Sequence, residues 1–589
     1  MMGPDENPLS PSSKAAPAIN IFDWQLWKGF WGIAKLYWFS DEKWKARGVL
    51  GLLLVFLFAF SGMNITLNFV GRDFMTALAE KNLSEFYRNM TIYIGVFIVA
   101  TPVAAFFSYV IRKLGVNWRL WLTNYFISRY FANRAYYRID QEGKIDNPDQ
   151  RISQDISSFT LQSLEFLSLL FFSVVQFFTF VGILWSISTR LVIVLTIYAT
   201  VGTALTMLFG KKLINLNFLQ LRKEADLRYG LVHTRDNAES IAFYQGEERE
   251  ASQVRHRLRN AVANLNLLIG WQRNLGFVAR AYEYLIFVIP YAVIAPLYFN
   301  GQIKFGVITQ AAGAFSQVLS ALSIVVSQFE QIGAFAAGIA RLKAFSDAIA
   351  GIRRDEITGI LPTIESIEEP RLAVEHMTLK TPNYGHTLFE DLSLSVPTRG
   401  SLLIMGASGA GKSSLLRALA GLWTSGTGRV IRPPLGDMLF LPQSPYMILG
   451  SLREQLLYPH LTRKIKKEEL SEILNRVRLE NLAERVGGFD SQMDWGHLLS
   501  LGEQQRLAFA RLLLSAPPYA FLDEATSALD VRNETHLYTL LKKAGTTYVS
   551  VGHRPTLIGH HDYVLELKGE GRWRLVSAAA FHQRLAGHE

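Results

Sequence analysis

Residues 401–413, SLLIMGASGAGKS, decide the fold of the C-terminal part of this chain. Residues 401–405 are apolar enough to predict a buried strand, and an apolar helical run follows from Leu415 to Leu422. A strand, a glycine-rich loop, Lys-Ser and a helix together form the context of a phosphate-binding loop. Backbone N–H groups at the start of such a helix surround phosphate oxygens. This part of the chain is therefore predicted to be an α/β domain that binds a nucleotide.

Each position of the loop has an expected role toward ATP and Mg²⁺. Lys412 would neutralise the β- and γ-phosphate oxygens, and Ser413 would hold the magnesium ion. We place Lys412 among the catalytic residues for this reason. The loop residues expected to contact ATP are Gly406, Ala407, Ser408, Gly409, Ala410, Gly411, Lys412, Ser413 and Ser414.

Two acidic residues end a second apolar strand, YAFLDE at 519–524. Asp523 would support Mg²⁺ together with Ser413. Glu524 would orient and polarise the attacking water, which makes it the expected general base. The strand is too apolar for these carboxylates to be an ordinary solvated strand end.

Two further polar residues follow predicted strands. Gln443 follows the strand 438–441, and His553 follows the strand 547–551. A polar residue just past the carboxyl end of a parallel strand points into the ligand crevice. We therefore expect Gln443 to contact both ATP and the metal, and His553 to be catalytic.

The amino-acid composition limits the number of domains and the kinds of chemistry that this chain can have. Its 589 residues contain no cysteine, 49% hydrophobic residues, and 60 Lys+Arg against 50 Asp+Glu. The length predicts several domains, because one core rarely exceeds about 250–300 residues. The absence of cysteine excludes thiol catalysis, cysteine-zinc sites and iron–sulfur clusters.

The net charge of +10 is unevenly distributed. Residues 1–352 hold 33 Lys+Arg against 24 Asp+Glu, whereas the remainder holds 27 against 26. Because the basic excess lies in the apolar part, we interpret it as membrane topology and expect no nucleic-acid partner.

Residues 21–350 are predicted to form an all-α transmembrane domain after a disordered tail at 1–20. The aromatic segment 24–38 predicts an interfacial helix in contact with membrane lipid. Positive charge places the N-terminus and the loops 112–164 and 211–276 in the cytoplasm. Six stretches are long and apolar enough to cross about 30 Å of hydrocarbon. They lie near 49–70, 91–111, 165–187, 191–210, 277–298 and 306–328.

The sixth span carries two polar stripes. Gln310, Gln317 and Gln328 fall within about 20° of one another at 100° per residue. We interpret these glutamines as lining a wet translocation cavity for hydrophilic cargo, because so polar a face does not suit lipid. The second stripe fits such a cavity and close helix packing equally well. Its members are Ser316, Ser320, Ser323 and Ser327.

Together, these motifs resemble the nucleotide-binding domain of an ABC transporter over about residues 370–589. The resemblance implies a head-to-tail pair of domains that closes on two ATP molecules. Ser500 and Gly502 of one chain would complete the site formed by the phosphate loop of the other. Gln443 would bridge Mg²⁺ and the membrane domain, and His553 would contact the γ-phosphate. The motifs are GASGAGKS at 406–413, Gln443, LSLGEQQR at 499–506, FLDE at 521–524, SALD at 527–530 and His553.

The chain departs from the family pattern at a few positions. The usual Gly and Gln of the signature are Leu501 and Glu503, and we keep Glu503 among the expected ATP contacts. The position of the adenine-stacking aromatic aligns with Thr381, so Tyr384, three residues on, is the candidate. Since the catalytic residues are intact, both sites of a homodimer are expected to hydrolyse ATP.

The membrane half resembles the peroxisomal acyl-CoA half-transporters and the bacterial BacA/SbmA-related transporters fused to an ATPase. NPDQR at 147–151, AESIAFY at 238–244 with Gly-Glu at 246–247, and FLPQSPYMILGSLREQLLYP at 440–459 carry this resemblance. It implies the six-helix exporter-type (type IV) fold. It also implies coupling helices near 140–155 and 236–246, with Asn147, Asp149, Arg151 and Glu239 as coupling residues.

The predicted function is ATP-driven transport of hydrophilic solutes or peptides by a homodimer in a bacterial inner membrane. Antimicrobial or host-type peptides and cobalamin are the expected cargo classes, and uptake is the expected direction. The alternative is movement of long-chain fatty acids or acyl-CoA, which the few basic residues in the spans disfavour. A third interpretation is an ATP-gated channel or regulatory membrane subunit, which would not need an intact general base.

Overall fold

The structure is a computed structural model that describes residues 24–143, 145–358, 362–382 and 384–586. The expected disordered tail at 1–20 lies outside these ranges. The chain divides into two compact units, Met1–Arg354 and Asp355–Glu589, which are described separately below.

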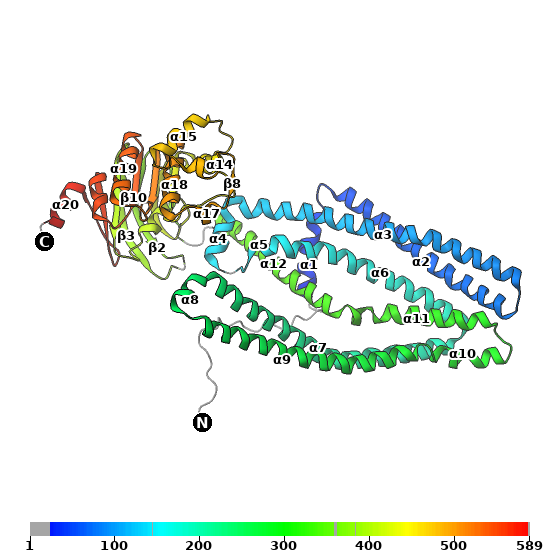
Figure 1. Ribbon diagram of the computed structural model, residues 1–589. Coiled ribbons are helices and arrows are strands. Elements are labelled where there is room, and N and C mark those ends of the chain that lie inside the picture. Colours follow the sequence, from blue (N-terminus) through cyan, green and yellow to red (C-terminus); the bar gives the residue numbers. More distant parts are fainter. Residues whose placement is uncertain (1–23, 144, 359–361, 383, 587–589) are drawn as a thin grey trace, which may run out of the picture. The chain divides into compact units, whose positions relative to one another are not determined.

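The first unit is built of long helices (Figure 1). The long helices pack pairwise, most extensively α2 against α3, α7 against α9, and α11 against α6 and α2. In chain order the helices are α1 (Trp24–Trp38), α2 (Lys43–Ala79), α3 (Leu83–Phe131), the 3₁₀ turn η1 (Ala132–Arg134), α4 (Ala135–Glu142), α5 (Pro148–Gln150), the π-helical turn η2 (Arg151–Asp155), α6 (Ile156–Ile187), α7 (Thr189–Asp236), α8 (Ala238–Tyr244), α9 (Glu247–Leu285), α10 (Ile289–Phe299), α11 (Phe305–Ser327) and α12 (Phe329–Thr358).

Within the described residues, five helical segments are long and apolar enough to cross a membrane. The expected fourth span corresponds to a shorter apolar stretch, Thr189–Gly202, at the start of α7. This unit is therefore a multi-pass membrane domain, and the sixth crossing remains a prediction. The five segments are Lys43–Ala79, Leu83–Gln141, Pro148–Ile187, Glu247–Phe299 and Phe305–Leu322.

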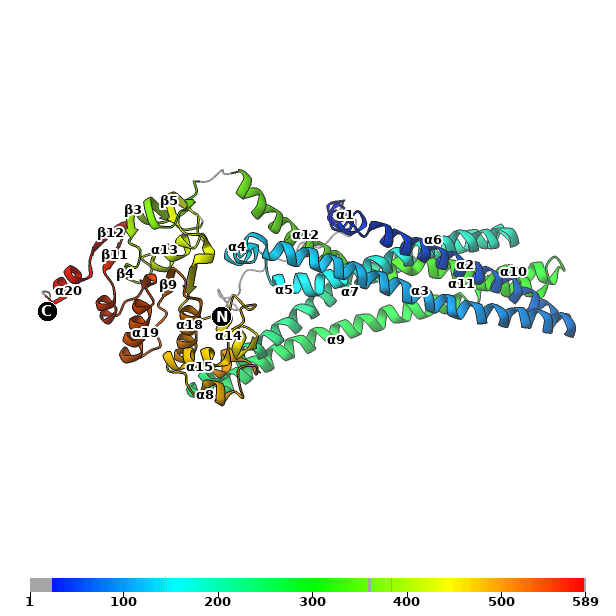
Figure 2. The same cartoon turned by 90° about the horizontal axis from the view of Figure 1, so that it is seen from above.

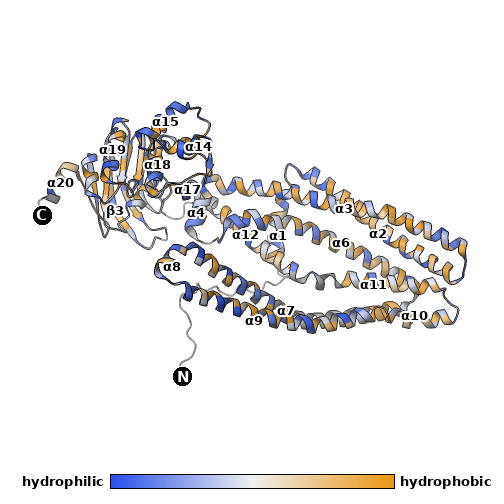
Figure 3. Ribbon diagram, viewed as in Figure 1, coloured by the Kyte–Doolittle hydropathy of each residue, from blue (hydrophilic) through white to orange (hydrophobic). Residues whose placement is uncertain are grey.

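Several helices extend far beyond the apolar stretches, as the long polar loops of the sequence indicate. Helix α7 contains 48 residues, which at 1.5 Å per residue gives about 70 Å. Figure 3 shows that α7 and α9 become hydrophilic toward α8, whereas their other ends and α10 are largely hydrophobic. Long helical extensions rather than irregular loops therefore connect these spans.

The expected fifth span, 277–298, is not one continuous helix. Helix α9 ends at Leu285, and α10 begins at Ile289 with Pro290 in its first turn. Proline lacks the backbone N–H and its ring clashes with the carbonyl four residues earlier, here that of Ile286. The interruption therefore follows from the sequence.

Helix α1 has one buried and one exposed face. Tyr37 is buried and stacks on Trp118 of α3 with ring centroids 5.7 Å apart. Trp24 and Trp31 are 70% and 55% exposed, on the opposite side. An exposed aromatic face beside lysines fits the predicted interfacial position.

The second unit contains two main sheets and the helices that cover them (Figures 1 and 2). The smaller sheet has the strand order β1-β5-β2-β3, and the larger has the order β12-β11-β4-β10-β9-β6. The smaller sheet comprises β1 (Glu365–Glu368), β2 (Leu372–Lys380), β3 (Thr387–Val396) and β5 (Gly426–Arg432), and the larger comprises β4 (Ser401–Gly406), β6 (Met438–Leu441), β9 (Tyr519–Asp523), β10 (Thr547–Val551), β11 (Tyr563–Gly569) and β12 (Arg572–Ser577).

A third, short pair of strands and the helices complete this unit. The short pair is β7 (Gly450–Ser451) and β8 (Gln492–Met493). The helices are α13 (Lys412–Leu419), η3 (Leu435–Asp437), α14 (Leu452–Leu457), α15 (Lys467–Arg476), α16 (Leu482–Arg485), α17 (Trp495–Leu498), α18 (Leu501–Ser515), α19 (Val531–Lys543), η4 (Pro555–His560) and α20 (Ala578–Ala586).

The parallel strands of the larger sheet end at the same edge. Asp523 of β9 pairs with Val551 of β10, and Leu522 pairs with Leu441 of β6. The core of the sheet is apolar, and Phe440 and Phe521 stack across β6 and β9 at 4.4 Å. This register brings the residues that follow the three strands to one place, as the crevice rule for parallel sheets predicts.

We predict that Gly306 of α11 accepts no side chain. A Cβ at Gly306 would lie 1.8 Å from the carbonyl oxygen of Arg72 in α2, whereas one at Gly313 would meet only Asn68 Nδ2, at 3.5 Å. Overpacking against backbone costs about 1–3 kcal/mol. Gly306→Ala should therefore lower the apparent melting temperature of the detergent-solubilised protein by several degrees, with Gly313→Ala as the matched control. Equal melting temperatures would contradict this account of the α2–α11 contact.

Candidate functional site

The phosphate-loop segment has a backbone that requires glycine at two positions. Gly406 has φ 153°, and a Cβ there would lie 2.4 Å from the carbonyl oxygen of Leu567. Gly411 has φ 92° and precedes the first residue of α13. The Lys412 ammonium group donates to the carbonyl oxygens of Gly406 and Ala407, at 2.8 and 3.0 Å. This places its positive charge over the loop, where phosphate oxygens would lie.

Ser413 and Asp523 are in direct contact. The Ser413 hydroxyl donates to Oδ1 of Asp523 at 2.9 Å. Burial raises the pKa of the Asp523 carboxyl above its ordinary value; the neighbouring charge of Glu524 raises it further, and the Ser413 hydrogen bond opposes the shift. A hydroxyl and a carboxylate are the hard oxygen ligands that Mg²⁺ prefers. These two residues therefore fit a magnesium ion.

Glu524 lies between Gln443 and His553, the two polar residues predicted to point into the ligand crevice. Its Oε2 accepts a hydrogen bond from Gln443 Nε2 at 3.1 Å, and its Oε1 lies 3.6 Å from His553 Nδ1. Its backbone is left-handed, with φ 47°, and its N–H donates to the carbonyl oxygen of Val551 at 3.1 Å. The ends of β6, β9 and β10 thus bring Gln443, Glu524 and His553 together.

The signature segment is organised around the start of α18. The Ser500 hydroxyl accepts from the Glu503 N–H at 3.3 Å, and Glu503 Oε2 accepts from the Ser500 N–H at 2.9 Å, which is a reciprocal capping box. Arg485 donates to Glu503 Oε1 at 2.7 Å. Burial acts to raise the pKa of Glu503, but the bonds from Arg485 and Ser500 hold it below its ordinary value.

In the described residues, Ser500 and Gly502 contact segments other than the phosphate loop of the same chain. The side chain of Ser500 forms its hydrogen bonds within its own helix cap. Gly502 lies against the segment 528–529, where a Cβ would be 3.2 Å from the carbonyl oxygen of Ala528. The glutamate that replaces the usual signature Gln at position 503 therefore has a local role in capping α18.

Tyr384 lies at the end of the smaller sheet. Its backbone is left-handed, with φ 57°, and its hydroxyl donates to the carbonyl oxygen of Pro362 at 2.8 Å. The ring is only partly buried. Its stacking on adenine remains a prediction.

The predicted coupling residues of the first long loop surround a helix start. Asn147 has φ 48° and precedes Pro148, the first residue of α5, and Asp149 follows in the same turn. Arg151 donates to Asp155 Oδ2 at 3.1 Å, and Arg341 of α12 donates to both carboxylate oxygens of Asp155 at 3.0 and 2.6 Å.

Sequence reasoning missed two members of this ion-pair cluster. The i,i+4 spacing of Arg151 and Asp155 could have indicated their pair. Arg341 is 186 residues away from Asp155 and had no local signal. In the second long loop, Glu239 lies in the first turn of α8.

The three glutamines of the sixth span do not share one open face. Gln310 is only 4% exposed, and its Nε2 has no hydrogen-bond partner. Helix α2 covers it, since Asn68 Nδ2 donates to the Gln310 carbonyl oxygen at 3.3 Å. Gln317 is exposed, and Gln328 is partly buried. Helical angle alone could not predict this difference, because it depends on where a neighbouring helix packs.

The comparisons with known proteins cover both units. Residues 33–299 match the family described as ABC transporter transmembrane region 2, and residues 389–527 match the family described as ABC transporter. An uncharacterised ABC transporter ATP-binding protein of the cyanobacterium Synechocystis is 49% identical, over 91% of this chain and 82% of its own. ABC transporter D family member 2, chloroplastic, of Arabidopsis thaliana is 42% identical, over 93% and 88%. The human lysosomal cobalamin transporter ABCD4 is 31% identical, over 96% and 98%.

The raised pKa of Asp523 predicts a pH-dependent requirement for Mg²⁺. Because burial lets this carboxyl take up a proton at a higher pH than an exposed aspartate does, protons should compete with the metal as the pH is lowered. The Mg²⁺ concentration for half-maximal ATPase activity should therefore be higher at an acidic pH than at a neutral one. Asp523→Asn should need more Mg²⁺ at both pH values and lose most of this pH dependence. An unchanged pH dependence in the variant would contradict the assignment.

Proposed function

The chain belongs to the ABC transporter family, and from this premise we propose that two copies form a homodimer that carries hydrophilic solutes or peptides across a bacterial inner membrane. The proposed direction is uptake. The family membership makes the chain an ATPase coupled to transport, with ATP and Mg²⁺ as its cofactors. The cargo class, the direction and the bacterial inner membrane are our proposals.

The observation that carries the proposal is the placement of Glu524 between Gln443 and His553. An acceptor carboxylate at the end of β9, beside the Ser413–Asp523 pair, is where a water attacking a γ-phosphate must be oriented. Bound Mg²⁺ would neutralise charge on the phosphates from its site at Ser413 and Asp523. Lys412 would bind phosphate oxygens, Glu524 would accept the proton of the water, and His553 would hold the γ-phosphate.

The contacts of the signature segment with other parts of its own chain support a pair of chains. Each chain holds the phosphate loop, Glu524 and His553, while its own Ser500 and Gly502 lie beside a different segment. A head-to-tail second copy would bring its Ser500 and Gly502 to the first chain's ATP. Two identical chains would form two complete sites, so a homodimer suffices.

The polar residues of the membrane unit support a hydrophilic cargo. Gln317 lies on an exposed face of α11 with Ser316 and Ser320. Gln310 and Gln176 bring unpartnered polar atoms into the interior of the described helices, and such groups are costly next to lipid. The relative named as a cobalamin transporter moves a large polar compound. We therefore place the cargo path along α11, with Gln317 as the first candidate contact.

The proposed topology has six crossings, with the start of α7 as the fourth. The basic loops then place the N-terminus, the α3–α6 connection and α8 in the cytoplasm. The α5 segment and α8, with Asn147, Asp149, Arg151 and Glu239, would act as coupling helices. Nucleotide-dependent closure would move these segments as rigid bodies.

We predict that uptake depends on Glu524. Purified protein in proteoliposomes should accumulate labelled peptide or cobalamin only with ATP and Mg²⁺. The Glu524→Gln variant should still bind ATP but hydrolyse it at least about 10²-fold more slowly, because the attacking water loses its proton acceptor. Lys412→Ala should weaken ATP binding itself, since the phosphates lose their nearest cation.

The same experiment distinguishes the competing functions. Accumulation of acyl-CoA instead of the polar cargo would replace our cargo proposal with the lipid alternative. Equal, slow hydrolysis by the wild type and Glu524→Gln would favour a nucleotide-gated channel or regulatory subunit. Transport that survives in Glu524→Gln would refute the general-base assignment.

A further inference from the structure

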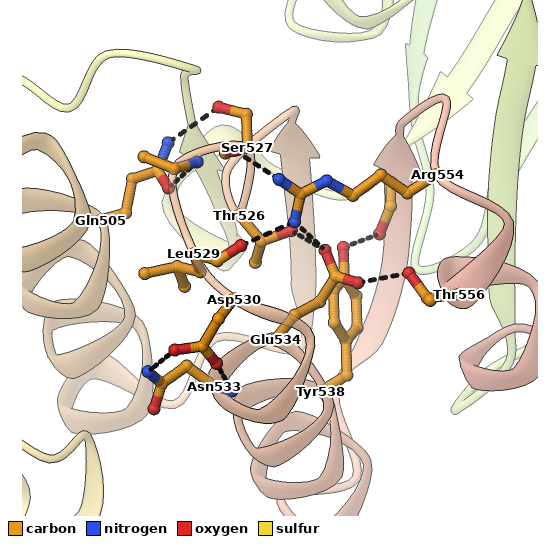
Figure 4. Close-up of polar contacts among 12 residues, drawn as sticks. Gln505, Thr526, Ser527, Leu529, Asp530, Asn533, Glu534, Tyr538, Arg554 and Thr556 are labelled. Atoms are coloured by element: carbon orange, nitrogen blue, oxygen red, sulfur yellow. Dashed lines mark hydrogen bonds and ion pairs between the residues drawn. The ribbon is translucent and has the colours of Figure 1, made fainter.

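Gln505 is a fully buried amide, and both its nitrogen and its oxygen are hydrogen-bonded. Figure 4 shows its contact with Ser527. Its Nε2 donates to the carbonyl oxygen of Gln443 at 3.0 Å and to the hydroxyl of Ser527 at 3.1 Å. Its Oε1 accepts from the N–H of Ala528 at 3.0 Å. A carboxamide has two N–H donors and one carbonyl acceptor. The partners therefore fix the orientation of the amide.

All three segments that Gln505 links belong to the proposed ATP site. Gln443 donates to Glu524 through its side chain, while its main chain binds Gln505. The segment 526–530 begins two residues after Glu524, and the Ser527 N–H donates to the Glu524 carbonyl oxygen at 3.0 Å. Gln505 itself lies one turn into α18, whose first turn is capped by Ser500. A single side chain thus links the surroundings of Glu524 to the signature helix.

The same segment is held from its other side by the residue after His553. Arg554 donates to the carbonyl oxygens of Ser527 and Leu529, both at 2.7 Å. It also lies 3.5 Å from Glu534, which is fully buried and accepts hydrogen bonds from Thr526 and Thr556 at 2.9 and 2.6 Å (Figure 4). Removing Arg554 would leave a buried carboxylate without a cation, which is strongly destabilising.

We propose that Gln505 is a positioning residue that makes Gln443, the segment 526–530 and the start of α18 move as one body. The Gln505 amide bonds Gln443 and Ser527 through its nitrogen and Ala528 through its oxygen. A shift of Gln443 would therefore move Ser527 and α18 with it or break these hydrogen bonds. Gly502 packs on the same segment, so the position of the signature turn follows. A closed pair would need this spacing, because Ser500 of a chain must reach the partner's ATP while Gln443 of the same chain stays in that chain's own ATP site. The proposal rests on the ATP site proposed above.

Gln505→Met tests the proposal, because methionine keeps the length of the side chain and removes all three hydrogen bonds. We expect kcat for ATP hydrolysis to fall about tenfold. Affinity for trinitrophenyl-ATP should stay within about twofold of wild type, since the phosphate loop is untouched. In the Glu524→Gln background, Gln505→Met should also reduce the ATP-dependent closure of the pair. Gln504→Met is the matched control, because the side chain of Gln504 donates to the carbonyl oxygens of Gly496 and Leu499, just before α18, and not to Gln443 or Ser527.

A kcat for Gln505→Met within twofold of Gln504→Met would overturn the proposal. A loss of ATP affinity as large as the loss of kcat would also overturn the proposal, because it would indicate that the whole nucleotide-binding domain is disturbed. If Gln505→Met does not fold, the Ser527→Ala variant replaces it as the test, because it removes one hydrogen-bond acceptor of Gln505. We then expect kcat to fall about two- to threefold while the ATP affinity stays unchanged. A wild-type rate for Ser527→Ala would then refute the proposal. Equal rates for the wild type and Lys412→Ala would show that the ATP site itself is wrong, independently of Gln505.

Discussion

The parallel register of β6, β9 and β10 is the constraint on which the proposed ATP site depends. Leu441 lies beside Leu522, and Asp523 lies beside Val551, so the three strands end at one level. Gln443, Glu524 and His553 lie just past these strand ends and are therefore close to one another. A slip of one residue would turn each side chain to the opposite face of the sheet. The buried apolar strands and the stacked Phe440 and Phe521 rings oppose such a slip.

A second layer of buried polar groups holds the segments between these strands. Gln505 and Glu534 are completely buried and fully hydrogen-bonded, which is the condition under which polar groups are tolerated in a core. Such groups specify one arrangement, because any alternative leaves a buried donor or charge without a partner. The strands thus set where the proposed catalytic side chains lie, and the buried network links the segments that we propose move with them.

Part of the geometry of the proposed ATP site could be predicted from the sequence. The phosphate loop is contiguous, and Gln443, Glu524 and His553 lie just past the ends of apolar strands, so local pattern and strand topology suffice for them. The break before α10 could also have been predicted, because Pro290 interrupts an otherwise apolar run.

Contacts set by packing between distant segments could not be predicted in the same way. The cluster of Arg151, Asp155 and Arg341 joins the first long loop to α12. The i,i+4 spacing indicates the Arg151–Asp155 pair, but no sequence pattern indicates Arg341. Gln310 and Gln317 lie at almost the same helical angle, yet α2 buries one and leaves the other exposed. The capping role of Glu503, in contrast, is local, because Ser500 and Glu503 have the Ser-x-x-Glu spacing of a capping box.

The central claim is that two copies close on ATP, and a distance measurement between them tests it most directly. The chain contains no cysteine, so His497→Cys, close to the signature segment, provides one spin-label site per chain without background. In the Glu524→Gln background, pulsed electron spin resonance should show the distance between the two labels shortening when ATP and Mg²⁺ are added. Adding Lys412→Ala should abolish that change. A label-to-label distance that stays the same with and without ATP would contradict the account.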